Sequence, residues 1–160
     1  MKTVYLLRHA KSKQDPSYET DFERPLAKRG KSDADDLGVW LRENDLTPDL
    51  IISSPAKRAR QTIEHCVEAG DLMCEVRYTQ SLYANGEQAY LEAVVALDDT
   101  VGSVMLVGHN PDISLAVEWL SGAYHRMPTC ALARVDLPIV QWSQLETKTG
   151  ALIQVRVPEE

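Results

Sequence analysis

Two histidines in this sequence follow short apolar segments, each where an expected strand ends. His9 lies in the segment RHAK at 8–11, and His109 lies in GHNP at 108–111. A third polar segment, SSPAKR at 53–58, also follows an apolar run and ends in an arginine. An imidazole acts as a nucleophile when one ring nitrogen is free and the other is held as a donor. Guanidinium groups bind phosphate oxygens through paired hydrogen bonds. These residue types therefore predict a site for a phosphoryl group.

Arginines in two of these segments are the candidates for binding the phosphoryl oxygens. Arg8 precedes His9 directly, and Arg58 lies one helical turn beyond the pair Ser54-Pro55. Transfer of a phosphoryl group builds negative charge on its oxygens, and positioned cations stabilise that charge without a metal. We predict that His9 attacks the phosphorus atom and that Arg8, Arg58 and His109 complete the catalytic site.

Other polar residues are assigned by their position in these segments. Lys11 and Asn110 belong to the same two histidine segments and are candidate substrate-binding residues. His65 is expected in the middle of a helix and His125 in a loop, where a structural role is the more common one. Arg60 is expected to face solvent.

The sequence indicates neither a metal nor a cofactor. A zinc site at His9 and His109 would need a third ligand at a typical spacing, and the adjacent Arg8 also argues against zinc. A Walker-type loop, a GxSxG elbow and a CxxxxxR phosphatase loop are all missing from the sequence. Three cysteines are scattered along the chain without ligand or disulfide spacing, and we expect small buried side chains at Cys66, Cys74 and Cys130.

The bulk composition is typical of one compact domain spanning residues 1–160. Hydrophobic residues make up 44% of the chain and charged residues 26%. No apolar stretch approaches the roughly 20 residues of a membrane span, and the first residues lack the pattern of a signal peptide. We therefore expect a soluble, cytoplasmic protein with no membrane partner.

Charge is distributed unevenly along the chain. The net charge of −7 argues against a nucleic-acid partner, because such proteins need a positive surface to displace counterions. Residues 1–60 nevertheless carry twelve Lys or Arg against ten acids, whereas 61–160 carry five against fourteen. If the basic segments converge in the fold, this acidic protein has a local region of positive potential that attracts a small anion. The alternative to convergence is that about half of these basic residues lie on ordinary solvent-exposed helix faces.

Alternating apolar runs and helical patterns predict an α/β protein. We expect strands at 3–8, 49–53, 74–78, 103–107, 131–137 and 151–157, and helices at 26–43, 56–69, 87–97 and 111–120. Strands that alternate with helices form βαβ units around a parallel sheet covered on both faces. No helix separates the last two strands, which are expected to pair antiparallel at one edge. The predicted fold is a three-layer α/β/α sandwich with a mostly parallel sheet of about six strands, one of them an antiparallel edge strand.

Local signals place the helix ends. Ser54-Pro55 and Asn110-Pro111 each put a capping oxygen before a proline at the expected first helical position. Gly122 is suited to the left-handed backbone conformation that commonly ends a helix, here the last one. In the first helix Gly30, Ala34 and Gly38 repeat every four residues, which predicts close approach of this face to the sheet. In open parallel sheets the ligand crevice lies outside the carboxyl ends of the strands, so the three polar segments should meet there.

Three motifs together resemble the histidine phosphatase superfamily, whose fold is called phosphoglycerate mutase-like. They are LRHAK at 7–11, SSPAKRARQT at 53–62 and VGHNP at 107–111. The segment DFERPL at 21–26, followed by Arg29-Gly30, is most similar to the SixA-type phosphohistidine phosphatase branch. The likeness extends over about residues 2–157.

The resemblance implies a role for each matching position. His9 would be the phosphorylated nucleophile, Arg8 and Arg58 would bind phosphoryl oxygens, and His109 would complete the pocket. Arg24, in the ERPL-like segment, would line the mouth of the site and bind substrate.

One departure from the family pattern concerns the proton donor. Larger relatives place a glutamate after the third strand in an LxE-type segment, whereas this chain has Leu82-Tyr83-Ala84. Glu87, three residues beyond this segment, is the candidate proton donor. An alkoxide leaving group requires protonation, but an imidazole, whose pKa is about 6.5, departs with little help. The missing glutamate therefore favours a phosphorus–nitrogen bond as the bond that is broken.

Three functions are compatible with these residues. The first is a metal-independent phosphohistidine phosphatase that acts through phospho-His9 on a protein such as a histidine phosphotransfer domain, and so modulates a phosphorelay. The second is a phosphomonoesterase for small sugar or nucleotide phosphates. The third is a non-catalytic module that binds a phosphorylated protein.

Overall fold

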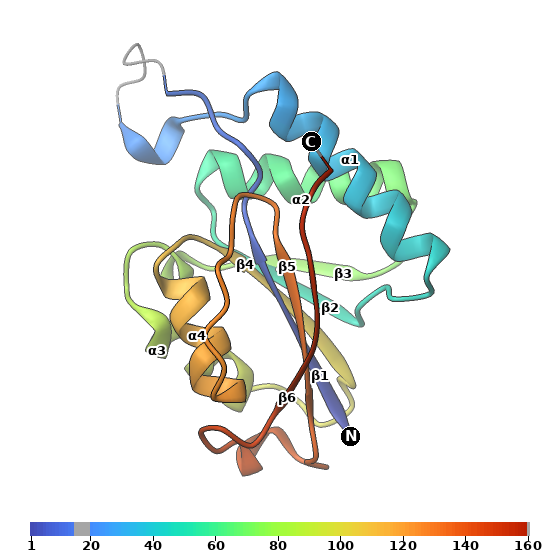
Figure 1. Ribbon diagram of the computed structural model, residues 1–160, viewed down its shortest axis with the longest axis vertical. Helices are drawn as coiled ribbons and strands as arrows, with labels where there is room; N and C mark the ends of the chain where they lie inside the picture. The colour runs from blue at the N-terminus through green and yellow to red at the C-terminus, as the bar shows by residue number, and fades with distance from the viewer. Residues whose placement is uncertain (15–19, 160) are drawn as a thin grey trace.

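The computed structural model describes residues 1–14 and 20–159 as a six-stranded sheet with helices on both faces (Figure 1). The strand order is β3-β2-β4-β1-β5-β6. The strands are β1 (Lys2–Arg8), β2 (Leu50–Ser53), β3 (Glu75–Tyr78), β4 (Ser103–Gly108), β5 (Leu132–Leu137) and β6 (Ala151–Arg156). The helices are α1 (Lys28–Glu43), α2 (Lys57–Gly70), α3 (Glu87–Val95) and α4 (Asp112–Ser121). Each expected element is present with ends within two residues of the prediction.

The sheet is parallel on one side and antiparallel on the other. β1, β2, β3 and β4 pair in parallel, whereas β5 is antiparallel to both β1 and β6. The last two strands therefore pair antiparallel at one edge, as expected. The strand that runs against the others is β5, which lies one position inside the edge strand β6.

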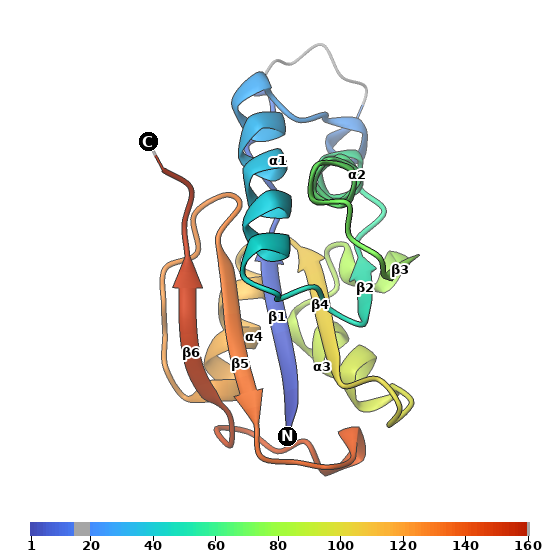
Figure 2. The ribbon, with the colours of Figure 1, turned by 90° about the vertical axis from the view of Figure 1, so that its right-hand side faces the viewer.

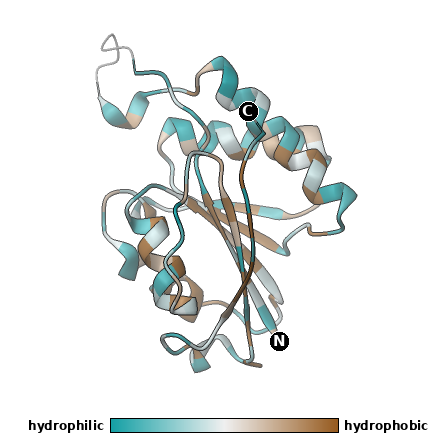
Figure 3. Cartoon of the chain, viewed as in Figure 1, coloured by the Kyte–Doolittle hydropathy of each residue, from teal (hydrophilic) through white to brown (hydrophobic). Residues whose placement is uncertain are grey.

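Two apolar cores cover the two faces of the sheet. Along β1, Val4 and Leu6 point into one core while Tyr5 and Leu7 point into the other, because successive side chains of a strand alternate between faces. α3 and α4 pack on the first core, and α1 and α2 pack on the second. Figure 2 shows α1 in front of the sheet with α3 and α4 behind it. The apolar strands lie between helices whose outer faces are hydrophilic (Figure 3).

The small residues of α1 serve helix packing as well as packing near the sheet. A Cβ atom at Gly30 would lie 2.1 Å from the carbonyl oxygen of Lys11, just after β1. A Cβ atom at Gly38 would lie 2.0 Å from the carbonyl oxygen of Cys66, which belongs to α2. The prediction that this face approaches the sheet is thus wrong at Gly38, because the neighbour there is a second helix on the same side.

Helix ends follow the expected signals with a small shift. α2 and α4 begin two and one residues after their prolines, so neither proline occupies the first helical position. Ser54 Oγ accepts a hydrogen bond from the backbone N–H of Ala56 at 3.2 Å. Asn110 Oδ1 accepts one from the N–H of Ser114 at 3.3 Å. Gly122 ends α4 in the left-handed conformation with φ of 75°, as expected.

Two further expectations concern single side chains and membrane spans. Cys66 and Cys130 are buried and Cys74 is half-buried, and all three are free thiols. Within the described residues, no helix combines the length and the apolar character needed to cross a bilayer.

The contact between Gly38 and α2 yields a prediction about stability. Gly38→Ala should lower the free energy of unfolding by more than about 2 kcal/mol, because the added methyl group meets backbone that only a helix shift can move. Urea denaturation measures this change. Gly102→Ala is the control. Its added Cβ would lie 3.1 Å from a side-chain oxygen of Asp49, which can shift more easily than the helix backbone. Equal stability of the two variants would contradict the assigned helix contact.

Candidate active site

The three polar segments meet at the carboxyl ends of neighbouring parallel strands. Arg8 at the end of β1 is in register with Gly108 at the end of β4, and Ser53 of β2 is in register with Val107. The strand pairing continues into the loops, where the N–H of His9 donates to the carbonyl oxygen of Gly108 at 3.0 Å. The sheet register therefore brings all three segments to one edge.

His9 and His109 face each other in this crevice. Their ring centroids are 5.2 Å apart, and both residues are buried, with exposures of 6% and 8%. His9 Nδ1 lies 2.7 Å from the carbonyl oxygen of Ala10. A carbonyl oxygen only accepts, so Nδ1 carries the proton and Nε2 retains its lone pair. The neutral ring of His9 is thus held in the tautomer that a nucleophile requires.

Backbone and hydroxyl contacts hold His109 in place. Its Nε2 lies 2.8 Å from Ser54 Oγ, at the start of α2. Its backbone N–H donates to the hydroxyl of Tyr90 at 3.2 Å, and that hydroxyl donates to the carbonyl oxygen of Leu82. Gly108 makes this contact possible, because a Cβ there would lie 1.8 Å from the Tyr90 oxygen. A buried tyrosine on α3 therefore positions the second histidine.

Both predicted arginines reach the same crevice. Arg58 is 5% exposed, and its Nη1 and Nη2 donate to the backbone oxygen and the carboxylate of Asp21 at 2.8 and 2.9 Å. Arg8 Nη1 donates to the carbonyl oxygen of Met127 at 3.1 Å. Arg8 Nε, Arg58 Nε and His109 Nδ1 are buried and have no hydrogen-bond partner within the described part of the chain. Buried polar nitrogens are normally paired, so these three identify a place for an acceptor.

Burial and mutual repulsion keep the two imidazoles neutral. Desolvation lowers the pKa of His9 to about 3, and the charges of Arg58 and Arg8 act in the same direction. Desolvation, followed by the charge of Arg58, lowers the pKa of His109 to about 4. The pKa of Arg8 is lowered by burial and by two neighbouring guanidiniums. An anion that enters the crevice relieves this repulsion.

Asp21 is the main residue of this site that the sequence reasoning missed. It lies in a short 3₁₀ turn, Asp21–Glu23, and pairs with Arg58 and with Arg24, whose Nη2 is 3.1 Å from Oδ1. The hydroxyl of Tyr83 donates to Oδ2 at 2.9 Å. Burial acts to raise the pKa of Asp21, but the hydrogen bonds from Tyr83 and Arg24 and the charge of Arg58 lower it to about 2. Its place before Arg24 in DFERPL was the available signal.

A hollow of about 300 Å³ opens beside these groups. It is lined by residues of four segments, namely Asp21, Arg58, Tyr83, Ala84, Gly86, His109, Asn110, Pro111 and Asp112. Asn110 is thus at the site, where its Nδ2 donates to the carbonyl oxygen of Met127 at 3.0 Å. Arg24 contacts the site through Asp21 and also binds Ser12 Oγ.

Several predicted residues do not line this hollow, namely His9, Arg8, Arg24, Lys11 and Glu87. Lys11 lines a separate hollow together with Arg29 and Arg126. Glu87 lines another one on the outer side of α3 and α4, beside Glu118. Two carboxyl groups do line the hollow, those of Asp21 and Asp112, and the sequence analysis selected neither. Burial and the charge of Glu87 raise the pKa of Asp112.

The other two histidines lie outside the crevice. His65 Nδ1 contacts Asp35 Oδ1 at 2.9 Å on the surface between α2 and α1. His125 is exposed, and its Nδ1 lies 2.8 Å from the carbonyl oxygen of Arg126. Among the described residues, no group of three or more His, Cys, Asp or Glu is arranged to hold a metal ion.

Comparison with known proteins gives the family. The model of the histidine phosphatase superfamily (branch 1) matches residues 4–83. The chain belongs to the histidine phosphatase superfamily. An uncharacterized protein of Mycobacterium leprae is 30% identical over 165 residues, covering 95% of this chain and 99% of the relative. The phosphohistidine phosphatase SixA of Escherichia coli is 28% identical over 140 residues, or 84% of each chain.

Solved structures agree with this family and with its phosphoglycerate mutase-like fold. A candidate phosphohistidine phosphatase SixA from Agrobacterium tumefaciens superposes with a TM-score of 0.85, with 32% identity and 98% coverage of both chains. A protein histidine phosphatase SixA in complex with tungstate superposes with a TM-score of 0.82, at 23% identity and with coverage of 96% and 95%. The chain is therefore a phosphatase of the histidine phosphatase superfamily, and its fold is similar to those of the SixA-type structures.

Neutral buried histidines make the stability of this phosphatase depend on pH. The folded-state pKa values of His9 and His109 lie below the unfolded value of 6.5, so the unfolded chain binds more protons between about pH 6.5 and 4. Stability should therefore fall as the pH falls through this window. We expect a loss of about 1 to 2 kcal/mol per histidine between pH 6.5 and 5, measured by urea denaturation.

Comparison of two variants isolates this effect. His109→Asn should show a weaker pH dependence than the wild type, because the group with the lowered pKa is gone. His125→Asn, at an exposed histidine, should keep the wild-type dependence. Identical profiles for wild type and His109→Asn would show that His109 is not buried in the neutral form.

Proposed function

We propose that this chain is a metal-independent phosphohistidine phosphatase in which His9 Nε2 accepts the phosphoryl group. The observation that carries the proposal is a set of three buried nitrogens, Arg8 Nε, Arg58 Nε and His109 Nδ1, that have no hydrogen-bond partner among residues 1–14 and 20–159. All three belong to residues close enough to His9 to act on its charge. An equatorial arrangement of such donors stabilises the charge that develops on a transferring phosphoryl group. Arg8, Arg58 and His109 are assigned to this role, and Asn110 to substrate binding at the rim.

The proposed reaction has two steps. In the first, the lone pair of His9 Nε2 attacks phosphorus and the phosphorus–nitrogen bond of the substrate breaks. The substrate ring carries a proton on its other nitrogen, so it keeps the electron pair and departs as a neutral imidazole. The proton on His9 stays on Nδ1, and its hydrogen bond to the carbonyl oxygen of Ala10 stabilises the positive charge that develops on the ring. In the second, water attacks phosphorus, the bond to Nε2 breaks, and inorganic phosphate and neutral His9 are released.

The position of the acids supports phosphohistidine as the substrate. The pKa of Asp21 is about 2, so this carboxyl is ionised at neutral pH and has no proton to donate. Glu87 lines a different hollow, so we no longer assign it as the proton donor. The ring of phosphohistidine can bring its own proton, because an imidazole has a pKa near 6.5, and it then leaves as a neutral imidazole without an acid from the enzyme. The substrate we propose is a phosphohistidine on a protein such as a histidine phosphotransfer domain, whose dephosphorylation would modulate a phosphorelay.

One observation favours a second candidate, a phosphomonoesterase for small sugar or nucleotide phosphates. Asp112 lines the hollow beside His109, and its raised pKa suits a carboxyl that donates a proton to an alkoxide. This role would replace the one first assigned to Glu87.

Trapping of the intermediate tests the nucleophile. Brief incubation with a labelled phosphohistidine substrate, followed by a denaturing quench at alkaline pH, should leave label on His9 that acid removes. His9→Ala should carry no label, whereas His65→Ala should carry the wild-type amount, since His65 lies on the surface. Label that survives in His9→Ala would overturn the assignment. Tight phosphate binding without any turnover would instead identify a non-catalytic phosphoprotein-binding module.

A substrate panel separates the two enzymatic candidates. We expect kcat/KM for phosphohistidine to exceed that for alkyl phosphates by at least about a hundredfold, since no ionisable acid is required for the first and one is required for the second. Asp112→Asn should leave phosphohistidine turnover within about threefold of wild type. Equal turnover of both substrate classes, together with loss of alkyl phosphate turnover in Asp112→Asn, would favour the phosphomonoesterase.

A further inference from the structure

A second hollow is lined by Lys11, two residues after His9, and by Arg126. Its volume is about 490 Å³, and its charged lining consists of Lys11, Arg29, Arg126 and Asp33. We call it the basic hollow. None of the catalytic roles assigned above uses it.

Two chain segments connect the basic hollow with the phosphoryl site. Lys11 follows His9 by two residues, and Arg126 precedes Met127, whose carbonyl oxygen accepts hydrogen bonds from both Arg8 and Asn110. The charge of Arg126 also acts on the guanidinium of Arg8. A ligand in the basic hollow would therefore lie beside the phosphoryl group without displacing it.

Two positive charges in the basic hollow are available to a ligand. Arg29 is paired with Asp33, with 3.0 Å between Nε and Oδ1. Lys11 and Arg126 are exposed, and neither forms an ion pair with another described residue. The chain as a whole carries −7, so this is a local positive region on an acidic protein.

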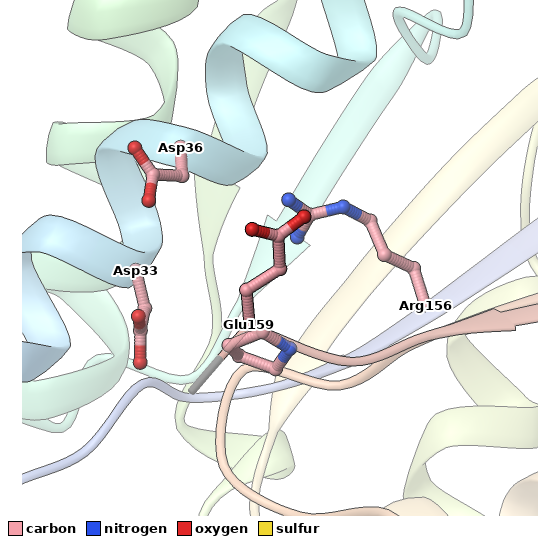
Figure 4. Close-up of a pocket in the computed structure, with 5 residues that line it drawn as sticks. Asp33, Asp36, Arg156 and Glu159 are labelled. Carbon is pink, nitrogen blue, oxygen red and sulfur yellow. The ribbon is translucent and has the colours of Figure 1, made fainter.

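The adjoining surface has the opposite character. Figure 4 shows the neighbouring hollow, where Asp33 and Asp36 of α1 lie on one side, Arg156 lies on the other and Glu159 lies between them; Pro158 completes the lining. An anion is repelled there and attracted to Lys11 and Arg126. The difference in charge between the two hollows thus favours binding of an anion in the basic hollow.

We propose that the basic hollow binds a carboxylate side chain of the phosphohistidine-bearing protein while His9 attacks its phosphoryl group. This assignment rests on the function proposed above and specifies its partner as a protein with an acidic residue close to the phosphohistidine. A protein surface suits this arrangement, because it presents a phosphohistidine and a carboxylate to two different lining sets at the same time. The loop that carries Arg126 also presents Tyr124, which is 68% exposed and offers an aromatic contact to a partner surface.

Two synthetic phosphohistidine peptides test the basic hollow. They share one sequence, except that the residues flanking the phosphohistidine are Glu and Asp in one and Gln and Asn in the other. At low salt the acidic peptide should have a kcat/KM about tenfold higher, and the ratio should fall toward one as salt is added. In Arg126→Glu the ratio should fall to one or below.

Arg42→Glu is the matched control. It makes the same charge change on an exposed arginine at the far end of α1, and it should keep the wild-type ratio. Free phosphohistidine serves as the reference substrate for each variant.

Each outcome bears on a different assignment. Equal turnover of the two peptides, or a preference that persists in Arg126→Glu, would overturn the role of the basic hollow while leaving the proposed function intact. A higher kcat/KM for free phosphohistidine than for the acidic peptide would make the occupant a small molecule. Absence of turnover of both peptides and of free phosphohistidine would overturn the proposed function and this assignment with it.

Discussion

The balance of charge around the buried guanidinium of Arg58 is the constraint on which the site depends. Burying a cation is costly unless it is paired, and Arg58 is paired with Asp21 alone, through the backbone oxygen and Oδ2 of that residue, among the described residues. Its Nε remains without a partner among the described residues, as does that of Arg8. The fold thus neutralises Arg58 enough to keep it inside the protein, and leaves donors for an incoming anion.

The neutrality of the two histidines follows from the same arrangement. Burial is the main cause of the lowered pKa values of His9 and His109, and the charges of Arg58 and Arg8 act in the same direction. A nucleophilic nitrogen needs its lone pair, so a buried crevice with two guanidiniums keeps His9 in the form that the proposed reaction requires.

The sequence was a good guide where the signal was local. Apolar runs predicted β1, β2 and β4, and polar segments directly after them placed Arg8, His9, Arg58 and His109 at one edge. Contacts between segments that lie far apart in the sequence were harder to predict. Asp21 lies in a turn without apolar periodicity, and only the tertiary fold brings it to Arg58. Glu87 was selected for its nearness in sequence, but it lines a different hollow, and Asp112 at the start of α4 lines the one beside His109.

The carbonyl oxygen of Met127 joins both sides of the site, since Arg8 and Asn110 each donate to it. The preceding residues 122–126 are exposed and carry no part of the core. Their composition and length are therefore free to change during evolution, provided that the anchor at Met127 stays in register. A phosphatase built in this way acquires a new partner by altering a loop tip, and its chemistry is inherited unchanged.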